Sequence, residues 1–178
     1  FLYDLVYQVK DAKGNVLDEV KSYAGMRKVH TANGRFYLNN QPYFQRLVLD
    51  QGFYPEGIWT APSDEDLKND IVLGKEAGFN GARLHQKVFE ERYYYWADKL
   101  GLLIMADTPN FWGEPTDSAK KDWEHCMRAQ VKRDYNHPSI FSWVNFNETW
   151  GLFTNTGETD EKGKPKRAFL PETQEWVR

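Results

Sequence analysis

The first 44 residues alternate apolar and polar side chains in the way that is typical of β-strands. Residues 3–9 (YDLVYQV) alternate, the segment DAKGN provides a turn, and residues 16–23 return as a second strand. The dipeptide Asn33-Gly34 then separates two further strand-like runs, which is a hairpin signal. We therefore expect β-structure throughout this part, with a boundary near residues 23–25.

From residue 45 onward, short apolar runs alternate with segments of helical periodicity. The expected strands cover residues 45–49, 79–84, 102–106 and 139–146. The expected helices cover residues 63–78, 90–101 and 120–135, and a last one begins at Pro171. Because the strands are apolar on both faces and alternate with helices, the pattern predicts a parallel sheet covered by helices.

Two α/β architectures satisfy this order: an open doubly wound sheet, or the first half of an eightfold barrel. No glycine-rich phosphate-binding loop follows any of the strands, and we expect no cofactor. The polar segment 154–167 (TNTGETDEKGKPKR) shows no periodicity and is expected to be a mobile loop.

Composition and charge narrow the class of protein. The 178 residues are 40% hydrophobic, enough for one core, and they carry 23 basic against 26 acidic side chains without a basic stripe. That balance argues against a nucleic-acid or membrane-surface partner, and no apolar run is long enough to span a bilayer. A single cysteine, Cys126, excludes an internal disulfide, and no histidine pair has metal-ligand spacing, so we expect no metal site.

Polar side chains follow each of the four expected strands. The carboxyl ends of parallel strands meet at one edge of a sheet, where α/β proteins bind their ligands. The residues at these four positions are Asp50, Arg83 with His85, Asp107 with Trp112, and Asn147 with Glu148. Unpaired charges at such an edge need partners or a substrate. A glutamate at a rigid strand end, beside amide, carboxylate and indole groups, suits general acid-base chemistry on a polyhydroxylated ligand.

The seven tryptophans divide into two groups. Trp112 and Trp150 follow strand ends, so they are either platforms for sugar rings or packing residues. We expect the other five to be packing residues: Trp59, Trp96, Trp123, Trp143 and Trp176.

Several segments resemble the catalytic domain of glycoside hydrolase family two, the group that holds β-galactosidases, β-glucuronidases and β-mannosidases. They include NGRFYLNNQPYFQR, GFNGARLHQ, YYWADKLGLLIMAD and RDYNHPSIFSWVNFNE, and they cover about residues 25–150. The last segment is the most specific, because it is similar to the family's signature around its acid/base glutamate. The resemblance implies that residues 1–24 are the tail of an immunoglobulin-like β-sandwich domain and that residues 25–178 are the N-terminal half of a (β/α)8 TIM barrel.

The resemblance also implies roles at the matching positions, with a carbohydrate as the substrate. Glu148 would protonate the glycosidic oxygen and then activate water, and Asn147 would bind the sugar 2-hydroxyl. Other polar and aromatic side chains at the rim would orient carboxylates and hydroxyls or line the glycone pocket. These further substrate-binding candidates are His85, Arg83, Asp107, Trp112 and Asp50.

The sequence departs from the family pattern at two strand ends and lacks one carboxylate. The first strand reads RLVLDQ, and the third ends on Asp107 where the family often has glutamate, so the identity of the sugar does not transfer. The family is retaining and needs a second carboxylate as nucleophile, which ends its seventh strand. Because only four strands are expected here, we expect a fragment that hydrolyses nothing alone and acts within a longer parent enzyme.

Two alternatives remain open. The chain would be a non-catalytic carbohydrate-binding or scaffold module if the parent lacks the seventh-strand carboxylate. Otherwise Asp50 or Asp107 would supply the second carboxylate within this chain. Each candidate also has a structural interpretation: Glu148 as an ion-pair partner, Asn147 as a turn residue and His85 as a structural hydrogen-bonding residue. Exposed apolar surface would favour a homo-oligomer, and the sequence does not indicate the compartment.

Overall fold

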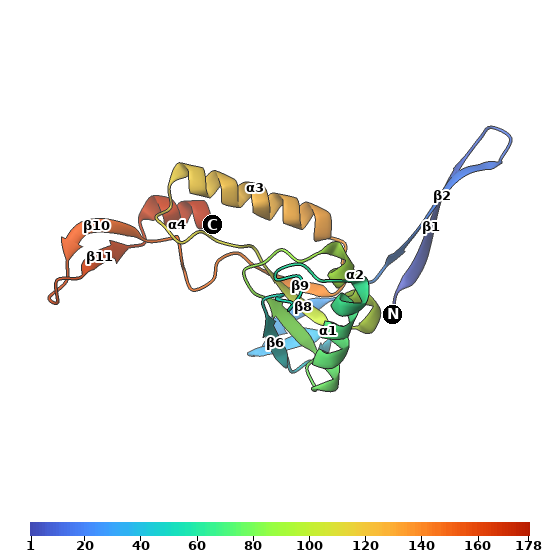
Figure 1. The fold of residues 1–178 in the computed structure, drawn as a ribbon, viewed down its shortest axis with the longest axis horizontal. Coiled ribbons are helices and arrows are strands. Elements are labelled where there is room, and N and C mark those ends of the chain that lie inside the picture. Colours follow the sequence, from blue (N-terminus) through green and yellow to red (C-terminus); the bar gives the residue numbers. More distant parts are fainter.

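The computed structural model describes residues 1–178 and places a four-stranded parallel sheet at the centre (Figure 1). The strands lie side by side in chain order: β6 (Leu47–Asp50), β7 (Gly81–Leu84), β8 (Leu103–Asp107) and β9 (Ile140–Val144). The helices are α1 (Asp64–Glu76), α2 (Glu91–Leu100), α3 (Asp117–Asp134) and α4 (Pro171–Val177). The expected alternation of strands and helices and the parallel pairing are confirmed.

Local capping signals set the bounds of three helices. Ser63 caps α1, because its hydroxyl accepts a hydrogen bond from the Asp66 amide at 3.2 Å. Thr116 caps α3 in the same way through the Ala119 amide. Gly101 ends α2 in the left-handed conformation (φ 73°), where a glycine pays no steric cost. These helix ends are therefore encoded by the residues next to them.

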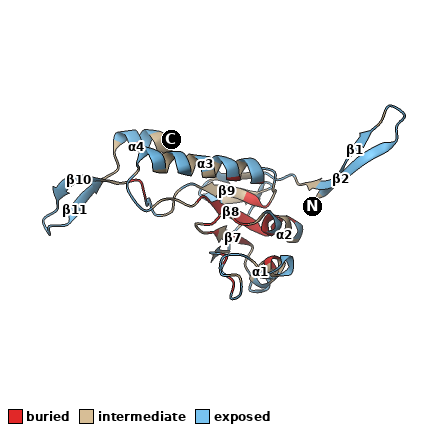
Figure 2. Cartoon of the chain, turned by 45° about the horizontal axis from the view of Figure 1, so that its top comes forward, coloured by how far each residue is buried: buried red, intermediate tan, exposed pale blue.

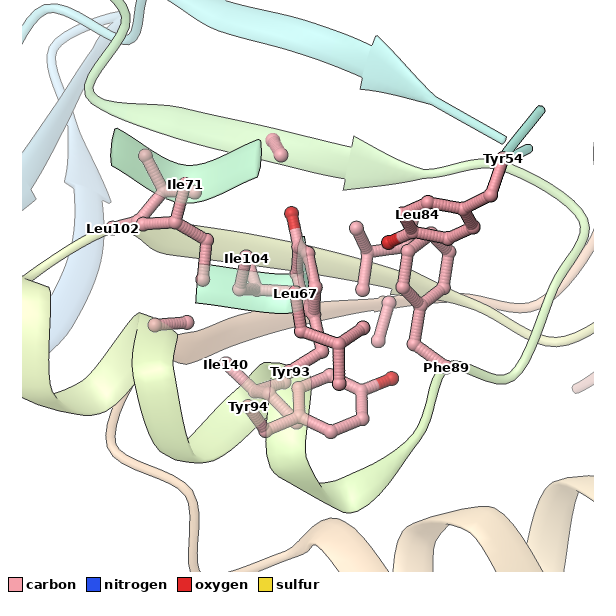
Figure 3. Close-up of a cluster of buried hydrophobic side chains, with 13 residues drawn as sticks. Tyr54, Leu67, Ile71, Leu84, Phe89, Tyr93, Tyr94, Leu102, Ile104 and Ile140 are labelled. Atoms are coloured by element: carbon pink, nitrogen blue, oxygen red, sulfur yellow. The ribbon is translucent and has the colours of Figure 1, made fainter. Parts of the chain in front are cut away.

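The hydrophobic core lies between the sheet and helices α1 and α2 (Figure 3). Leu67 and Ile71 come from α1, while Tyr93 and Tyr94 come from α2 and are almost completely buried. Figure 2 shows buried residues concentrated in the sheet and α2, and exposed ones in the outlying segments. Burial of such large side chains is the main favourable term for this part of the fold.

The sheet is closely packed around Gly81, at the start of β7. A Cβ atom at this position would lie 2.4 Å from Leu47 Cδ2 and 2.6 Å from the Leu103 carbonyl oxygen. Leu47 and Leu103 pair with Gly81 from the two neighbouring strands. The missing side chain therefore allows β6, β7 and β8 to begin at the same level.

A buried carboxylate, Asp98 of α2, joins three separate segments. Its Oδ2 atom accepts a hydrogen bond from the Tyr23 hydroxyl at 2.7 Å and lies 2.6 Å from His137 Nδ1. Its Oδ1 atom accepts one from the Ser139 amide at 2.8 Å. Burial, and after it the hydrogen bond to Asp98, raises the pKa of Tyr23, which keeps this hydroxyl protonated as a donor.

Two hairpins and a small sheet surround the centre. The hairpin β1 (Tyr3–Lys10) and β2 (Val16–Ala24) projects from one end of the molecule, as Figure 1 shows, and is mostly exposed. The small antiparallel sheet consists of β3 (Val29–Ala32), β4 (Arg35–Leu38) and β5 (Gln41–Pro42). Its Phe36 ring contacts Phe141 of β9, with ring centroids 5.3 Å apart, so this sheet packs against the last strand of the centre.

The expectation of a mobile loop at residues 154–167 was wrong. This segment holds an antiparallel hairpin, β10 (Thr154–Thr159) and β11 (Pro165–Ala168), at the opposite end of the molecule from β1 and β2 (Figure 1). Both faces of the hairpin are solvent-exposed, so its strands lack the apolar alternation by which a sequence reveals them. The turn around Asp160, whose side chain accepts hydrogen bonds from the Lys162 and Lys164 amides, closes it.

The last strand of the sheet is shorter than expected. The sequence predicted a strand over 139–146, but β9 ends at Val144, and Phe146 stacks on Trp123 of α3 with ring centroids 4.6 Å apart. The chain turns away from the sheet to make this contact.

No helix combines the length and the apolar character needed to cross a membrane. No group of three His, Cys, Asp or Glu residues lies close enough together to hold a metal ion.

Candidate active site at the strand ends

The ends of β7 and β8 are joined by a partly buried ion pair. Arg83 of β7 donates two hydrogen bonds to the carboxylate of Asp107 in β8, from Nε to Oδ1 at 3.1 Å and from Nη2 to Oδ2 at 2.9 Å. The Asp107 side chain is 1% exposed, so its charge depends on this guanidinium for compensation. This bidentate geometry fixes the orientation of the Arg83 and Asp107 side chains relative to each other.

Asn147 extends this ion pair to the chain that follows β9. The same Nη2 atom of Arg83 donates to the Asn147 side-chain oxygen at 2.8 Å. Three strand ends that lie far apart in the sequence are therefore linked by one guanidinium. The expectation that Arg83, Asp107 and Asn147 meet at one edge agrees with this geometry.

Two residues that the sequence analysis did not single out complete the link. Gln86 donates from its amide to Asp107 Oδ2 at 3.3 Å, and its side chain hydrogen-bonds Asn110. Asn110 in turn accepts from the Asn147 amide at 3.2 Å and donates to the Trp150 carbonyl oxygen at 2.8 Å. Their signal in the sequence was position: Gln86 lies two residues beyond β7, and Asn110 lies three residues beyond β8.

The first strand end forms a separate polar group with His85. His85 Nδ1 lies 2.8 Å from the Gln51 side-chain nitrogen, and its amide donates to the Asp50 carbonyl oxygen at 2.7 Å. The Asp50 carboxylate accepts from the Gly52 amide at 2.8 Å and from the Tyr93 hydroxyl at 3.3 Å. Burial raises the pKa of Tyr93 well above its usual value, so Tyr93 remains a donor to Asp50.

Glu148 lies in a turn, not at a rigid strand end as expected. It lies four positions after Val144, the last residue of β9, and its backbone is left-handed (φ 52°), as is that of Thr149 (φ 60°). Non-glycine residues rarely adopt this conformation, and where they do the strain often marks a functional position. The turn is closed by a hydrogen bond from the Trp150 amide to the Asn147 carbonyl oxygen at 3.1 Å. Glu148 is thus held one residue away from the Arg83–Asn147 link.

The carboxylate of Glu148 is exposed and sits beside an indole pair. Its Oε2 atom accepts a hydrogen bond from Trp150 Nε1 at 3.2 Å. The Trp150 ring contacts Trp112, with centroids 4.6 Å apart, and Trp112 is 71% exposed. The structural alternative for Glu148, an ion pair with a neighbouring arginine, is absent from this geometry. The Glu148 carboxylate is therefore accessible to a molecule bound at this edge.

The two aspartates behave differently from Glu148. Asp107 is buried and occupied by Arg83, and Asp50 is held by an amide and a tyrosine hydroxyl. Neither carboxylate has the freedom that a nucleophile attacking a sugar carbon needs. Of the three carboxylates at this edge, only that of Glu148 is exposed and lacks a charged partner. The neighbouring polar groups are hydrogen-bonded to one another.

A repeated βα unit with its polar side chains gathered at the carboxyl ends of parallel strands defines an enzyme domain of the TIM-barrel class. Comparison with known sequences gives the family. The TIM barrel domain of the glycosyl hydrolases family 2 matches residues 29–162, and the chain belongs to this family.

Individual relatives agree with the family assignment. A β-galactosidase of Photobacterium profundum is 33% identical over 156 residues, which are 83% of this chain and 15% of that protein. A putative β-glucuronidase of Formosa agariphila is 31% identical over 159 residues, which are 84% of this chain and 18% of that protein. The chain thus spans less than a fifth of the length of these curated relatives.

Solved structures show the same fold. The β-glucuronidase 2 of Bacteroides uniformis, covalently bound to cyclophellitol-6-carboxylate aziridine, superposes with a TM-score of 0.75 at 26% identity, covering 83% of this chain and 18% of that one. A β-glucuronidase from Ruminococcus gnavus in complex with D-glucuronic acid gives a TM-score of 0.78 over 99% of this chain and 27% of that one. At 23% identity the second likeness concerns the fold alone.

Proposed function

We propose that this chain supplies the first four βα units of a retaining glycoside hydrolase that cleaves β-linked glycosides. In this proposal Glu148 is the general acid and base, and the nucleophile comes from a later strand of the same barrel. Residues 25–178 form the first half of that barrel, and residues 1–24 close a preceding β-sandwich domain. A carbohydrate is the substrate, and no cofactor is required.

The observation that carries the proposal is the contrast between Glu148 and the groups beside it. Asn147 is bonded to Arg83, which is bonded to Asp107, whereas the next residue along the chain presents an exposed carboxylate. An acid that must protonate a leaving oxygen and later deprotonate water needs such freedom on a fixed support. Family membership adds the chemical context.

The supporting residues follow from the same geometry. In this proposal the side-chain amide nitrogen of Asn147 donates to a sugar hydroxyl, while Arg83 fixes the side-chain carbonyl oxygen. Asp50 ends β6, the edge strand farthest from β9, and His85 follows β7; in this proposal they contact further hydroxyls. Trp112, which is largely exposed beside Trp150, provides a flat apolar face for a sugar ring.

Replacing Glu148 tests the proposal directly. In the full-length protein that carries this chain, Glu148→Gln is expected to lower kcat/KM for an alkyl β-glycoside by about 10²–10⁴-fold, because general acid catalysis is lost. The loss should be much smaller for a 2,4-dinitrophenyl glycoside, whose leaving group needs no proton. A screen of 4-nitrophenyl β-D-galactoside, β-D-glucuronide and β-D-mannoside identifies the glycone.

Glu161→Gln provides the matched control, since Glu161 is also an exposed glutamate in a turn but lies in the β10–β11 hairpin. It should retain wild-type activity. If Glu148→Gln is as active as Glu161→Gln on the alkyl glycoside, Glu148 is not the acid. An inverted anomeric product, followed by NMR, would contradict the retaining mechanism.

A second function, carbohydrate binding without turnover, is supported by one observation. Asp107 and Asp50 are both occupied by hydrogen bonds, so the described residues offer no second free carboxylate at this edge. If the full-length protein binds sugars but hydrolyses none of the glycosides in the screen, this alternative becomes the better account.

A further inference from the structure

The turn that carries Glu148 is strained at two successive residues. Glu148 and Thr149 are both left-handed, and such conformations persist at non-glycine residues only where the surrounding structure imposes them. Across the turn itself, the Trp150 amide donates one backbone hydrogen bond of 3.1 Å to the Asn147 carbonyl oxygen. A single bond of this kind is a weak restraint. Contacts from other segments are therefore needed to keep the Glu148 carboxylate in position.

Asn110, in the loop that follows β8, holds this turn at both ends. Its side-chain oxygen accepts a hydrogen bond from the Asn147 amide at 3.2 Å, and its side-chain nitrogen donates to the Trp150 carbonyl oxygen at 2.8 Å. The two contacts flank Glu148 and Thr149 along the chain. A carboxamide offers an acceptor and a donor side by side, so an alanine at this position would release both ends of the turn.

Gln86, in the loop that follows β7, fixes the Asn110 side chain in turn. The two residues form a reciprocal pair: the Asn110 amide donates to Gln86 Oε1 at 3.1 Å, and Gln86 Nε2 donates to Asn110 Oδ1. Gln86 is itself held at φ 56°, and its amide donates to the Asp107 carboxylate at 3.3 Å. Two carboxamides therefore tie the turn at Glu148 to the ends of both β7 and β8.

The backbone that presents Asn110 is anchored in the interior. Thr108, two residues earlier, is 1% exposed, and its hydroxyl donates to the Gln130 side chain of α3 at 2.8 Å. The Thr108 amide donates to the Val144 carbonyl oxygen at 3.0 Å. Gln130 is also buried and donates to the Asp107 carbonyl oxygen at 3.0 Å. Buried polar groups that are satisfied in this way make the structure around them rigid, so Asn110 has a fixed base.

We infer that Asn110 is a positioning residue for the proposed acid, with Gln86 as its support. In this inference Asn110 acts through the backbone of residues 147–150. Proton transfer to a leaving oxygen requires the acid to lie within hydrogen-bond reach of that oxygen, so a small displacement of the carboxylate is costly. The inference rests on the proposed function of Glu148, and it predicts that loss of Asn110 weakens proton donation in particular.

The dependence of the rate on the leaving group tests this role in the full-length protein. In Asn110→Ala, kcat/KM for an alkyl β-glycoside is expected to fall about tenfold to hundredfold, because a displaced acid protonates the leaving group poorly. For a 2,4-dinitrophenyl glycoside, whose leaving group needs no proton, it should fall less than about threefold. The ratio of the alkyl to the dinitrophenyl value therefore drops. Gln86→Met, which keeps Asn110 and removes its support, should lower the ratio by a smaller factor.

Asn80→Ala is the matched control. Asn80 makes the same pair of contacts before β7, at the other end of the sheet, where its side chain accepts from the Arg46 amide at 2.8 Å and donates to the Phe44 carbonyl oxygen at 2.9 Å. Its removal should destabilise the fold to a similar degree and leave the ratio at the wild-type value. An equal fall of the ratio in Asn80→Ala and Asn110→Ala would assign Asn110 to general stability and overturn the inference.

Hydrogen exchange of the full-length protein gives a readout that does not need turnover. The Asn147 amide is bonded to Asn110, and release of the turn should expose it to solvent. Mass spectrometry of a peptide spanning residues 145–152 should therefore show faster exchange in Asn110→Ala than in wild type or in Asn80→Ala. Unchanged exchange would overturn the positioning role.

The remaining outcomes separate this inference from the proposed function. An unchanged ratio in a folded Asn110→Ala variant overturns the positioning role, while the loss of activity in Glu148→Gln still supports the acid. If Asn110→Ala does not fold, an unchanged ratio in Gln86→Met is the contradicting result. If no glycoside is hydrolysed, the proposed function fails, and faster exchange in Asn110→Ala still supports Asn110 as the residue that holds the turn.

Discussion

The rim of the sheet has two halves that differ in how their polar groups are satisfied. Around Arg83 and Asp107, almost every polar atom is bonded to another side chain, and the carboxylate is buried. Around Glu148, the carboxylate is exposed and accepts a single hydrogen bond, from Trp150. The polar groups of the first half therefore fix one another, whereas the carboxylate of the second half stays accessible, as its proposed role as an acid requires.

The largest expected effect on stability comes from breaking the ion pair between Arg83 and Asp107. Arg83→Met leaves the Asp107 carboxylate buried without a cation and should lower the free energy of unfolding by about 3–5 kcal/mol. Arg92→Met is the matched control, because it breaks the exposed pair with Asp64 and should cost less than about 1 kcal/mol. Chemical denaturation measures both.

If the two arginine variants lose equal stability, the distinction between a structural and a catalytic half is not supported. The double variant Arg83→Met/Asp107→Leu should recover part of the loss, since both charges are removed together.

A smaller effect is expected at the glycine that anchors the exposed half. Gly151 has φ 79°, and a Cβ atom there would lie 2.5 Å from the Phe111 carbonyl oxygen. Gly151→Ala should therefore displace the turn that carries Glu148 and cost about 1–3 kcal/mol. Gly113→Ala is the control, because nothing lies within 4 Å of its added methyl group. Equal unfolding midpoints and equal activities of the two variants would contradict the anchoring role.

The single hydrogen bond to Glu148 should have a modest effect on activity. Trp150→Phe removes the Nε1 donor and keeps an aromatic ring beside Trp112, so kcat/KM on an alkyl glycoside should fall about threefold to tenfold. Trp96→Phe removes a bond of the same kind, to Asp64 at 3.0 Å, on helix α2 away from the turn. Activity that falls equally in both variants would mean that Trp150 acts through general packing.

The smallest effect concerns an exposed ion pair outside the rim. A hydrogen bond from Arg92 lowers the pKa of Asp64 from its ordinary 3.8 to about 2. A lowered pKa contributes stability that is present above pH 4 and is lost as the pH falls toward 2. Unfolding midpoints between pH 2 and pH 4 should therefore fall less steeply for Asp64→Asn than for wild type. Glu65→Gln, one residue along the same helix, should follow the wild-type slope.

Much of the centre could be predicted from the sequence because its signals are local. The apolar runs of the four strands and the caps Ser63 and Gly101 are encoded where they act. The gathering of Arg83, Asp107 and Asn147 followed from the rule that parallel strands end at one edge. Their mutual hydrogen bonds agree with that prediction, while their catalytic roles remain predictions.

The features that the sequence did not reveal depend on distant partners. Phe146 leaves the strand because Trp123 of α3 receives its ring, a contact across 23 residues of chain. The hairpin at residues 154–168 has no apolar face, so periodicity could not identify it. Trp59 was expected to be a packing residue, but it is 53% exposed. The sequence alone does not show that Lys87 hydrogen-bonds the Trp59 carbonyl oxygen and so fixes this part of the loop.

The carboxylate of Asp98 links the projecting hairpin β1–β2 to the central sheet. It receives Tyr23 from the projecting hairpin and the Ser139 amide from the residue before β9. Tilting the hairpin away from α2 would therefore break the hydrogen bond from Tyr23 to Asp98. The angle of the outlying arm is thereby set by the same helix that lines the core.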